Sequence, residues 1–441
     1  MKYYSTNKKV PPASLKRAVM KGLADDRGLF MPENIDLLKD FVVSDMQDMS
    51  FQEISCIVAQ ALFGDDIDRD TLENIVNDTL NFDAPAVHIH DNIYALELFH
   101  GPTLAFKDVG ARFMARLLNY FVEKENVKEV NVLVATSGDT GSAVANGFLG
   151  VDGIRVFVLY PKGKVSPVQE CQFTTLGQNI TALEVDGTFD DCQALVKTAF
   201  MDGELKKAQI KLTSANSINV ARFLPQSFYY FYAYSQLDRK GKADELVVSV
   251  PSGNFGNLCA GLIAYWMGLP IKRFIAAGNS NRAFREYLNT GNYAPMPTIA
   301  TIANAMDVGD PSNFARIIDL FSIYPNPYQA IKKRINGYNY SDAQISETMR
   351  TVSSKYGYIL DPHGACGYQA LVEDRLTERE TGLFLETAHP AKFKSAVEQI
   401  IGRDIEMPAK LQAFMKGEKQ SVNISKDFTC FRQFLMDTLS R

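Results

Sequence analysis

The chain has 441 residues, of which 46% are hydrophobic and 22% are charged, and its formal net charge is −5 at pH 7. This length is sufficient for two or three domains, and the composition is that of a folded globular protein. A slightly acidic chain is unsuited to general nucleic-acid binding, because that binding depends on a basic surface.

The sequence contains no pattern typical of an export signal or a membrane span. Residues 1–10 are polar and lack the apolar core of a secretion signal. The most apolar helix-like stretch, 258–269, is shorter than the roughly 20 residues that cross a bilayer. We therefore expect a cytoplasmic protein with neither a membrane nor a nucleic acid as partner. The six cysteines form no Cys-x-x-Cys pair, which predicts reduced, mostly buried thiols and no metal site.

Residues 1–91 predict a helical N-terminal domain. Ser14 is a suitable N-cap for a helix over 15–22, and 51–63 carries apolar residues at helical spacing. From residue 93 onward, apolar strand-like runs alternate with helical ones. The expected strands are 93–99, 130–135, 154–159, 180–185, 246–250, 274–277 and 383–386. The expected helices are 109–121, 142–149, 167–176, 190–200, 217–234 and 258–268.

The alternation of strands and helices predicts an α/β fold with mainly parallel sheets. Two neighbouring parallel strands need a crossover connection, which is usually a helix. Ligands of such sheets bind outside the carboxyl ends of the strands. We therefore expect ligand-binding residues where a predicted strand ends and a helix begins.

Two glycine-rich turns occupy such positions. Residues 135–141 read Ala-Thr-Ser-Gly-Asp-Thr-Gly, and residues 251–257 read Pro-Ser-Gly-Asn-Phe-Gly-Asn. Unpaired N–H groups at a helix N-terminus, together with the helix dipole, favour bound anions. The first turn is equally consistent with a cluster of N-cap side chains, and the second with a structural strand-to-helix turn. Neither turn contains Gly-x-Gly-x-x-Gly, and the chain has no P-loop motif, so a nucleotide site is not indicated.

Lys107 follows His-Gly-Pro-Thr-Leu-Ala-Phe at a predicted helix start. Taken alone, it is consistent with an ordinary solvated lysine. A helix N-terminus and the apolar neighbours Leu104, Ala105 and Phe106 would disfavour its ammonium form and so ease imine formation. Two anion-binding turns and an imine-forming lysine indicate a phosphate-bearing aldehyde cofactor and an anionic substrate. Pyridoxal 5'-phosphate meets the first requirement.

Six segments and the N-terminal region together resemble the threonine synthase family, which are pyridoxal-phosphate enzymes of the tryptophan-synthase β fold group. The six segments are 100–108, 135–143, 217–226, 251–257, 361–364 and 387–393. Residues 3–6 and 22–32 resemble the N-terminal region of the longer members. The resemblance implies the type II fold of these enzymes, with mainly parallel sheets in a large and a small domain. It places the helical region at 1–91, the large cofactor-binding domain at 92–120 and 215–441, and the small domain at 121–214.

The resemblance also implies roles for individual residues. Lys107 would carry the cofactor as an aldimine and shuttle protons. The cofactor phosphate would be held by Gly253, Asn254, Phe255, Gly256 and Asn257. Thr387 would bind the pyridine nitrogen, and Asp139 would lie near the ring, where many relatives of this fold have asparagine.

The substrate-binding residues implied by the resemblance fall into two groups. Thr136, Ser137, Gly138 and Thr140 would hold the substrate carboxylate. Arg222 and Asn219 are the first candidates for the substrate phosphate, with Ser166, Lys162 and Lys164 after them. His363 and His389 lie in turn-like breaks and are consistent with hydrogen-bonded loop residues.

The implied reaction is that of a lyase converting O-phosphohomoserine and water to L-threonine and phosphate. The resemblance leaves the oligomeric state open between monomer and dimer. Two alternatives stay open at this stage. One is another pyridoxal-phosphate amino-acid lyase of the same fold, and the other is a non-catalytic relative of threonine synthase. The presence of Lys107 and of both turns favours a catalyst.

Overall fold

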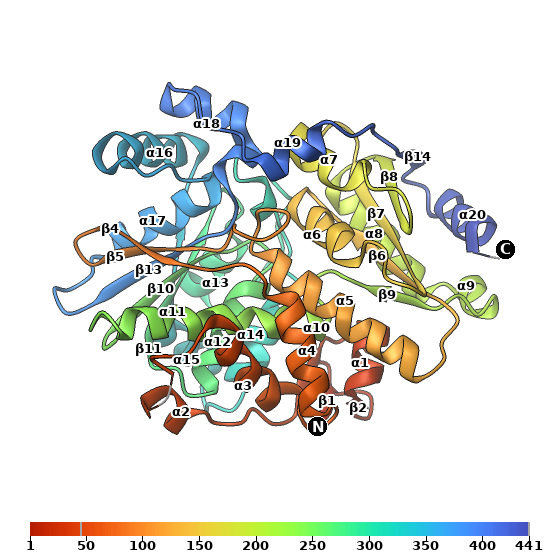
Figure 1. Ribbon diagram of the computed structural model, residues 1–441, viewed down its shortest axis with the longest axis horizontal. Coiled ribbons are helices and arrows are strands. Elements are labelled where there is room, and N and C mark those ends of the chain that lie inside the picture. The colour runs from red at the N-terminus through yellow and green to blue at the C-terminus, as the bar shows by residue number, and fades with distance from the viewer. Residues whose placement is uncertain (45, 440–441) are drawn as a thin grey trace.

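The computed structural model describes residues 1–44 and 46–439 and contains two large sheets, which Figure 1 shows side by side. The six-stranded sheet has the order β12-β11-β10-β13-β5-β4, and the five-stranded sheet has the order β14-β8-β7-β6-β9. The first sheet comprises β4 (Ala86–His90), β5 (Ile93–Glu97), β10 (Leu246–Pro251), β11 (Ile271–Gly278), β12 (Ile335–Asn339) and β13 (Thr381–Glu386). The second comprises β6 (Val130–Ala135), β7 (Ile154–Pro161), β8 (Ile180–Asp186), β9 (Leu212–Ser214) and β14 (Val422–Ser425).

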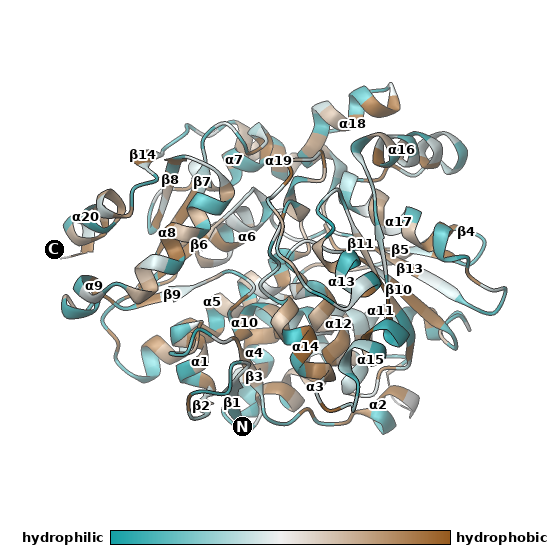
Figure 2. Cartoon of the chain, turned by 180° about the vertical axis from the view of Figure 1, so that it is seen from behind, coloured by the Kyte–Doolittle hydropathy of each residue, from teal (hydrophilic) through white to brown (hydrophobic). Residues whose placement is uncertain are grey.

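Within these two sheets the described strand pairs are parallel except for β4 with β5, which confirms the predicted sheet type. Every residue of β6, β10 and β13 is buried. Strands buried on both faces read as continuous apolar runs, and this is why the sequence located them closely. Figure 2 shows apolar colour concentrated in the interior elements and hydrophilic colour mostly on peripheral loops and helix surfaces.

Helices cover both sheets. Those beside the five-stranded sheet are α5 (Lys107–Lys124), α6 (Asp139–Phe148), α7 (Pro167–Thr174), α8 (Phe189–Met201), α9 (Gly203–Lys207) and α20 (Phe428–Leu439). The others after residue 214 are α10 (Val220–Phe223), η1 (Leu224–Ser227), α11 (Phe228–Asp238), α12 (Gly256–Trp266), α13 (Ala283–Thr290), η2 (Asn304–Met306), α14 (Phe314–Phe321), α15 (Pro327–Arg334), α16 (Asp342–Tyr356), α17 (Pro362–Asp374), η3 (Pro390–Phe393), α18 (Lys394–Ile401) and α19 (Ala409–Met415). Within the described ranges, no helix has the length and apolarity needed to cross a membrane.

The N-terminal region is mainly helical, as predicted, and Figure 1 shows it along one edge of the molecule. Its helices are α1 (Leu15–Lys21), α2 (Lys39–Ser44), α3 (Phe51–Phe63) and α4 (Arg69–Thr79). The Ser14 side chain accepts a hydrogen bond from the backbone N–H of Arg17 and so caps α1. A three-stranded antiparallel sheet of β1 (Lys2–Ser5), β2 (Ala13–Ser14) and β3 (Phe30–Pro32) was not expected, because such short strands leave little periodic signal.

Two features of the fold differ from the expectation. The helix expected over 217–234 is divided into α10, η1 and α11, and η1 contains Pro225, which has no backbone N–H to donate. The end of the chain does not follow the expected large domain at 215–441, because β14 pairs with β8 of the other sheet. Phe431 and Leu435 of α20 complete the apolar cluster beside that sheet. The other domain boundaries remain predictions.

Candidate functional site

A pocket opens where the two sheets approach each other. Ala135 ends β6, Pro251 ends β10 and Thr387 follows β13, and all three line this pocket. The N-termini of α5 and α12 also open on it, because Lys107 and Gly256 are lining residues. The sequence placed ligand chemistry at the carboxyl ends of parallel strands, and both glycine-rich turns do meet at this pocket.

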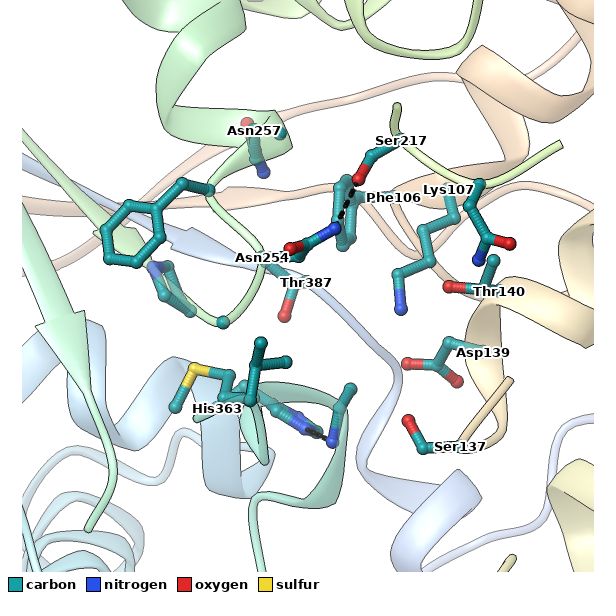
Figure 3. Close-up of a pocket in the computed structure, with 18 of the residues that line it drawn as sticks. Phe106, Lys107, Ser137, Asp139, Thr140, Ser217, Asn254, Asn257, His363 and Thr387 are labelled. Carbon is teal, nitrogen blue, oxygen red and sulfur yellow. Dashed lines mark hydrogen bonds between the residues drawn. The ribbon is translucent and has the colours of Figure 1, made fainter. Parts of the chain in front are cut away.

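Lys107 is the first residue of α5, and Figure 3 shows its amino group pointing into the pocket near Asp139. The loop before it is held rigidly. The Asp108 carboxylate accepts hydrogen bonds from the Thr103 backbone N–H at 2.9 Å and from the Thr103 hydroxyl at 2.5 Å. The Phe106 N–H donates to the Thr387 carbonyl at 2.9 Å. These bonds fix the direction in which the lysine side chain leaves the backbone.

The surroundings of Lys107 lower the pKa of its ammonium group below that of an ordinary lysine. Burial lowers the pKa of Lys107 from 10.5 to about 8, and the charge of Asp139 opposes this while Lys392 and Arg222 support it. Burial alone would raise the pKa of Asp139, but the ammonium groups of Lys392 and Lys107 hold it well below its usual range. The pocket therefore combines an easily deprotonated amine with a firmly ionised carboxylate.

The turn at 251–257 forms a close-fitting wall. Phe255 adopts a left-handed conformation with φ of 61°, directly before α12 begins at Gly256. Asn254 is held by Ser217, to which its amide donates at 2.9 Å, as Figure 3 shows. The Oδ1 atom of Asn257 accepts from two tyrosine hydroxyls, while its buried Nδ2 has no hydrogen-bond partner among the described residues. The five residues expected to hold a phosphate, 253–257, all line the pocket.

The turn at 136–141 contributes only some of its expected residues. Ser137, Asp139 and Thr140 line the pocket. Thr136 and Gly138 are not among the described residues that line it. The Thr136 hydroxyl accepts from the backbone N–H groups of Gly138 at 2.9 Å and Gly141 at 2.7 Å. The Thr136 hydroxyl and the Gly138 N–H are therefore used within the turn, and their expected contact with the substrate stays a prediction.

Of the candidates for binding the substrate phosphate, the structure brings Arg222 to the pocket. Arg222 is 2% exposed, and burial lowers the pKa of its guanidinium to about 10. One guanidinium nitrogen lies 3.4 Å from the Lys107 carbonyl oxygen, and its Nε has no hydrogen-bond partner among the described residues. A buried guanidinium with unused donors is well suited to an anion.

The Asn219 side chain makes its hydrogen bonds within the protein, and its expected contact with the substrate stays a prediction. Its side chain caps α10 by accepting from the Ala221 N–H, and its amide donates to the carbonyls of Val19 and Ser214. Ser166 caps α7 in a similar way, through the Gln169 N–H. Lys162 and Lys164 are exposed. None of these four is among the described residues that line the pocket.

Two pocket features had no functional assignment from the sequence. His363 lines the pocket, with its Nδ1 at 2.5 Å from the Asp361 carboxylate and its Nε2 accepting the Ala305 N–H at 3.2 Å. These contacts place the ring proton on Nδ1. The other feature is the ion pair between Lys392 and Asp139, at 2.7 Å. The Asp361-Pro362-His363 spacing was a usable signal for the first, whereas Lys392 lies in the segment 387–393 but nothing in that segment indicated a contact with Asp139.

The residues present fit pyridoxal phosphate. A Cβ atom at position 253 would lie 2.7 Å from the Met306 Cα, so the turn can pack this closely only with glycine there. The orphaned Nδ2 of Asn257 and the first-turn N–H groups of α12 offer donors to a phosphate. Lys107 supplies an amine for an aldehyde, and Figure 3 shows the Thr387 hydroxyl pointing into the same cavity.

Comparison with known proteins agrees with this geometry. Residues 77–385 match the family model described as "Pyridoxal-phosphate dependent enzyme". Residues 2–80 match "Threonine synthase N terminus", and residues 364–435 match "Threonine synthase, C-terminal".

Individual relatives match along the whole chain. A threonine synthase from Haemophilus influenzae is 45% identical, with 99% of this chain and 100% of the relative covered. The crystal structure of threonine synthase from Escherichia coli superposes with a TM-score of 0.92 at 44% identity, covering 99% of this chain and 100% of that one. The pyridoxal-phosphate-bound threonine synthase from Brucella melitensis gives a TM-score of 0.91 at 34% identity, with 99% of both chains covered. This chain therefore belongs to the threonine synthase family of pyridoxal-phosphate dependent enzymes.

Proposed function

We propose that this enzyme converts O-phosphohomoserine and water to L-threonine and phosphate, with Lys107 as the residue that binds the cofactor covalently. The observation that carries this proposal is the meeting of three groups in one pocket. These are the amine of Lys107, the glycine-rich turn at 253–257 and the hydroxyl of Thr387. The family membership of the chain supports the choice of reaction.

The cofactor would be held at its two ends. Gly253, Asn254, Phe255, Gly256 and Asn257 would bind its phosphate, mainly through backbone N–H groups. Thr387 would hydrogen-bond its pyridine nitrogen. When bound, the cofactor withdraws electrons from the substrate and so stabilises negative charge next to the amino group.

Lys107 is suited to moving protons. With a pKa of about 8, Lys107 would be neutral in about a tenth of the molecules at pH 7, compared with fewer than one in a thousand for an ordinary lysine. Its Nζ would accept the proton from the substrate Cα and later return one there. A single positioned amine can serve several proton transfers, provided that its pKa lies near the working pH.

The substrate would be held by charge and by hydroxyl groups. Ser137 and Thr140 would hydrogen-bond its carboxylate at the N-terminus of α6, where the helix dipole favours an anion. Arg222 would bind the phosphate as it departs, because negative charge grows on that group in the transition state. We also propose a cytoplasmic location, which the six free cysteines of the described chain support.

The test is an assay of both products. The purified enzyme should release phosphate and L-threonine from O-phosphohomoserine in equal amounts. Phosphate with 2-oxobutyrate and no threonine would instead identify another lyase of this fold. Absence of any product, together with no absorption band from bound cofactor, would favour the non-catalytic alternative.

A further inference from the structure

A second lysine lies beside the proposed reaction centre and has no part in the steps above. Lys392 belongs to η3, after β13, and its side chain is 0% exposed. Its Nζ lies 2.7 Å from Oδ1 of Asp139 and donates to the Thr103 carbonyl at 2.8 Å. Lysine is almost never fully buried unless it is paired, so this position carries a specific electrostatic interaction.

The contacts of Lys392 fix it between the two sheets. The Thr103 carbonyl that accepts its ammonium also accepts the amide of Gln172, at 3.0 Å. The backbone carbonyl of Lys392 accepts the Ser166 hydroxyl at 3.0 Å. Gln172 and Ser166 lie beside the five-stranded sheet, whereas Lys392 follows the six-stranded one. Lys392 is therefore held in place, through its backbone and its side chain, by groups from both sides of the pocket.

The partner of Lys392, Asp139, is the carboxylate whose charge acts on Lys107. Figure 3 shows Asp139 and Lys107 directed toward each other across the pocket. A carboxylate with no other counterion would attract the Lys107 ammonium and so hold it protonated. Asp139 instead has Lys392 at 2.7 Å and the Gln169 amide at 2.8 Å, both on Oδ1.

We propose that Lys392 is a positioning residue, whose buried ammonium neutralises Asp139 and thereby leaves Lys107 free to act as an amine. The inference rests on the proposed function, in which Lys107 forms the bond to the cofactor. It predicts that the two members of the pair act on Lys107 in opposite directions.

The charged groups around Lys107 support these opposite effects of Lys392 and Asp139. Asp139 favours its ammonium, whereas Lys392 and Arg222 disfavour it, in addition to the effect of burial. His363 faces Asp139 from α17. The carboxylate of Asp108, the next residue, is occupied by two hydrogen bonds from Thr103.

The experiment measures the pKa of Lys107 directly, without turnover. The full-length chain, freed of cofactor and checked by circular dichroism, is labelled briefly with acetic anhydride across a pH series. Mass spectrometry then gives the extent of acetylation at residue 107. In the parent protein the midpoint should lie at about pH 8.

Lys392→Met should raise this midpoint by about one pH unit or more, because it removes a positive charge and leaves Asp139 unpaired. Asp139→Asn should lower it, and the double variant should return it close to the parent value. Lys394→Met is the matched control, because that lysine pairs with Glu398 and is not among the described residues lining the pocket. Its midpoint should equal the parent value.

An unchanged or lowered midpoint in Lys392→Met would overturn the proposal. If this single variant does not fold, Asp139→Asn is compared with the double variant, which removes the same ammonium in a constant background. A higher midpoint in the double variant supports the proposal, and equal midpoints overturn it. The labelling midpoint does not depend on the reaction catalysed, so failure of the threonine assay in the parent protein would reject the proposed function separately.

Discussion

Gly253 lies so close to Met306 that a Cβ atom at position 253 would be 2.7 Å from the Met306 Cα. The same atom would lie 3.0 Å from the Ala305 carbonyl oxygen. Both neighbours are backbone atoms of η2, so they cannot rotate away as a flexible side chain could. A direct backbone-to-backbone contact therefore fixes the position of the turn proposed to bind the cofactor phosphate.

Gly253→Ala should weaken binding of pyridoxal phosphate by roughly 5- to 150-fold, because relieving an overpacked contact typically costs about 1–3 kcal/mol. The dissociation constant is measured by titrating the cofactor-free chain and following absorbance. Gly203→Ala is the control, since a Cβ there meets no atom within 4 Å. An equal dissociation constant for Gly253→Ala and the parent would contradict the proposed cradle.

Thr387→Val should reduce cofactor affinity, whereas Thr387→Ser should retain most of it. Valine has nearly the same shape but lacks the hydroxyl proposed to bind the pyridine nitrogen. Leaving a buried polar group without its partner typically costs about 1–3 kcal/mol, which corresponds to roughly 5- to 150-fold in affinity. The absorption spectrum of the bound cofactor should also shift in the valine variant. If the valine and serine variants bind the cofactor equally well, the hydroxyl of Thr387 does not bind the pyridine nitrogen.

Arg222→Met should lower kcat/KM for O-phosphohomoserine by roughly 10- to 150-fold, through loss of charge-assisted hydrogen bonds worth about 1.5–3 kcal/mol. Methionine keeps an unbranched, apolar side chain in this buried position. Inhibition by inorganic phosphate should weaken as well, while binding of L-threonine, which carries no phosphate, should change little. Unchanged phosphate inhibition would place the phosphate site elsewhere.

His389 should contribute to unfolding at acid pH. Burial lowers the pKa of His389 from 6.5 to about 4, and its Nδ1 accepts the Ala391 N–H in η3. Between pH 6.5 and about 4, His389 is protonated in the unfolded chain but not in the folded chain. The free energy of unfolding should therefore fall as pH falls through this range. The loss is at most about 3 kcal/mol.

His389→Asn keeps an acceptor for the Ala391 N–H but cannot become protonated. Its free energy of unfolding, measured with urea between pH 7 and pH 4, should decline less steeply than that of the parent. Identical slopes for the two proteins would show that the pKa of His389 in the folded chain is the same as in the unfolded chain.

The sequence predicted those features that depend on local pattern. The strand at Val130–Ala135 was predicted with its exact bounds, because a strand buried on both faces is a continuous apolar run. The two glycine-rich turns were placed at the pocket for a related reason, since each follows such a strand directly.

Other features depend on contacts between distant parts of the chain. Thr136 and Asn219 have side chains suited to a substrate, but backbone groups use their hydrogen-bonding capacity, and for Asn219 these groups include the distant Val19 carbonyl. Lys392 is separated from Asp139 by more than half the chain, and only the packing of the two sheets brings them together. The short edge strand at Val422–Ser425 has one buried residue, which is too weak a pattern to assign it to a sheet.

The central claim is that Lys107 binds the cofactor. The most direct measurement is reduction of the holoenzyme with borohydride, followed by peptide mapping of the stable adduct. We predict a single pyridoxyl label on Lys107 and none in the Lys107→Ala variant. A label on another lysine, the neighbouring Lys392 included, or no label at all would contradict the account.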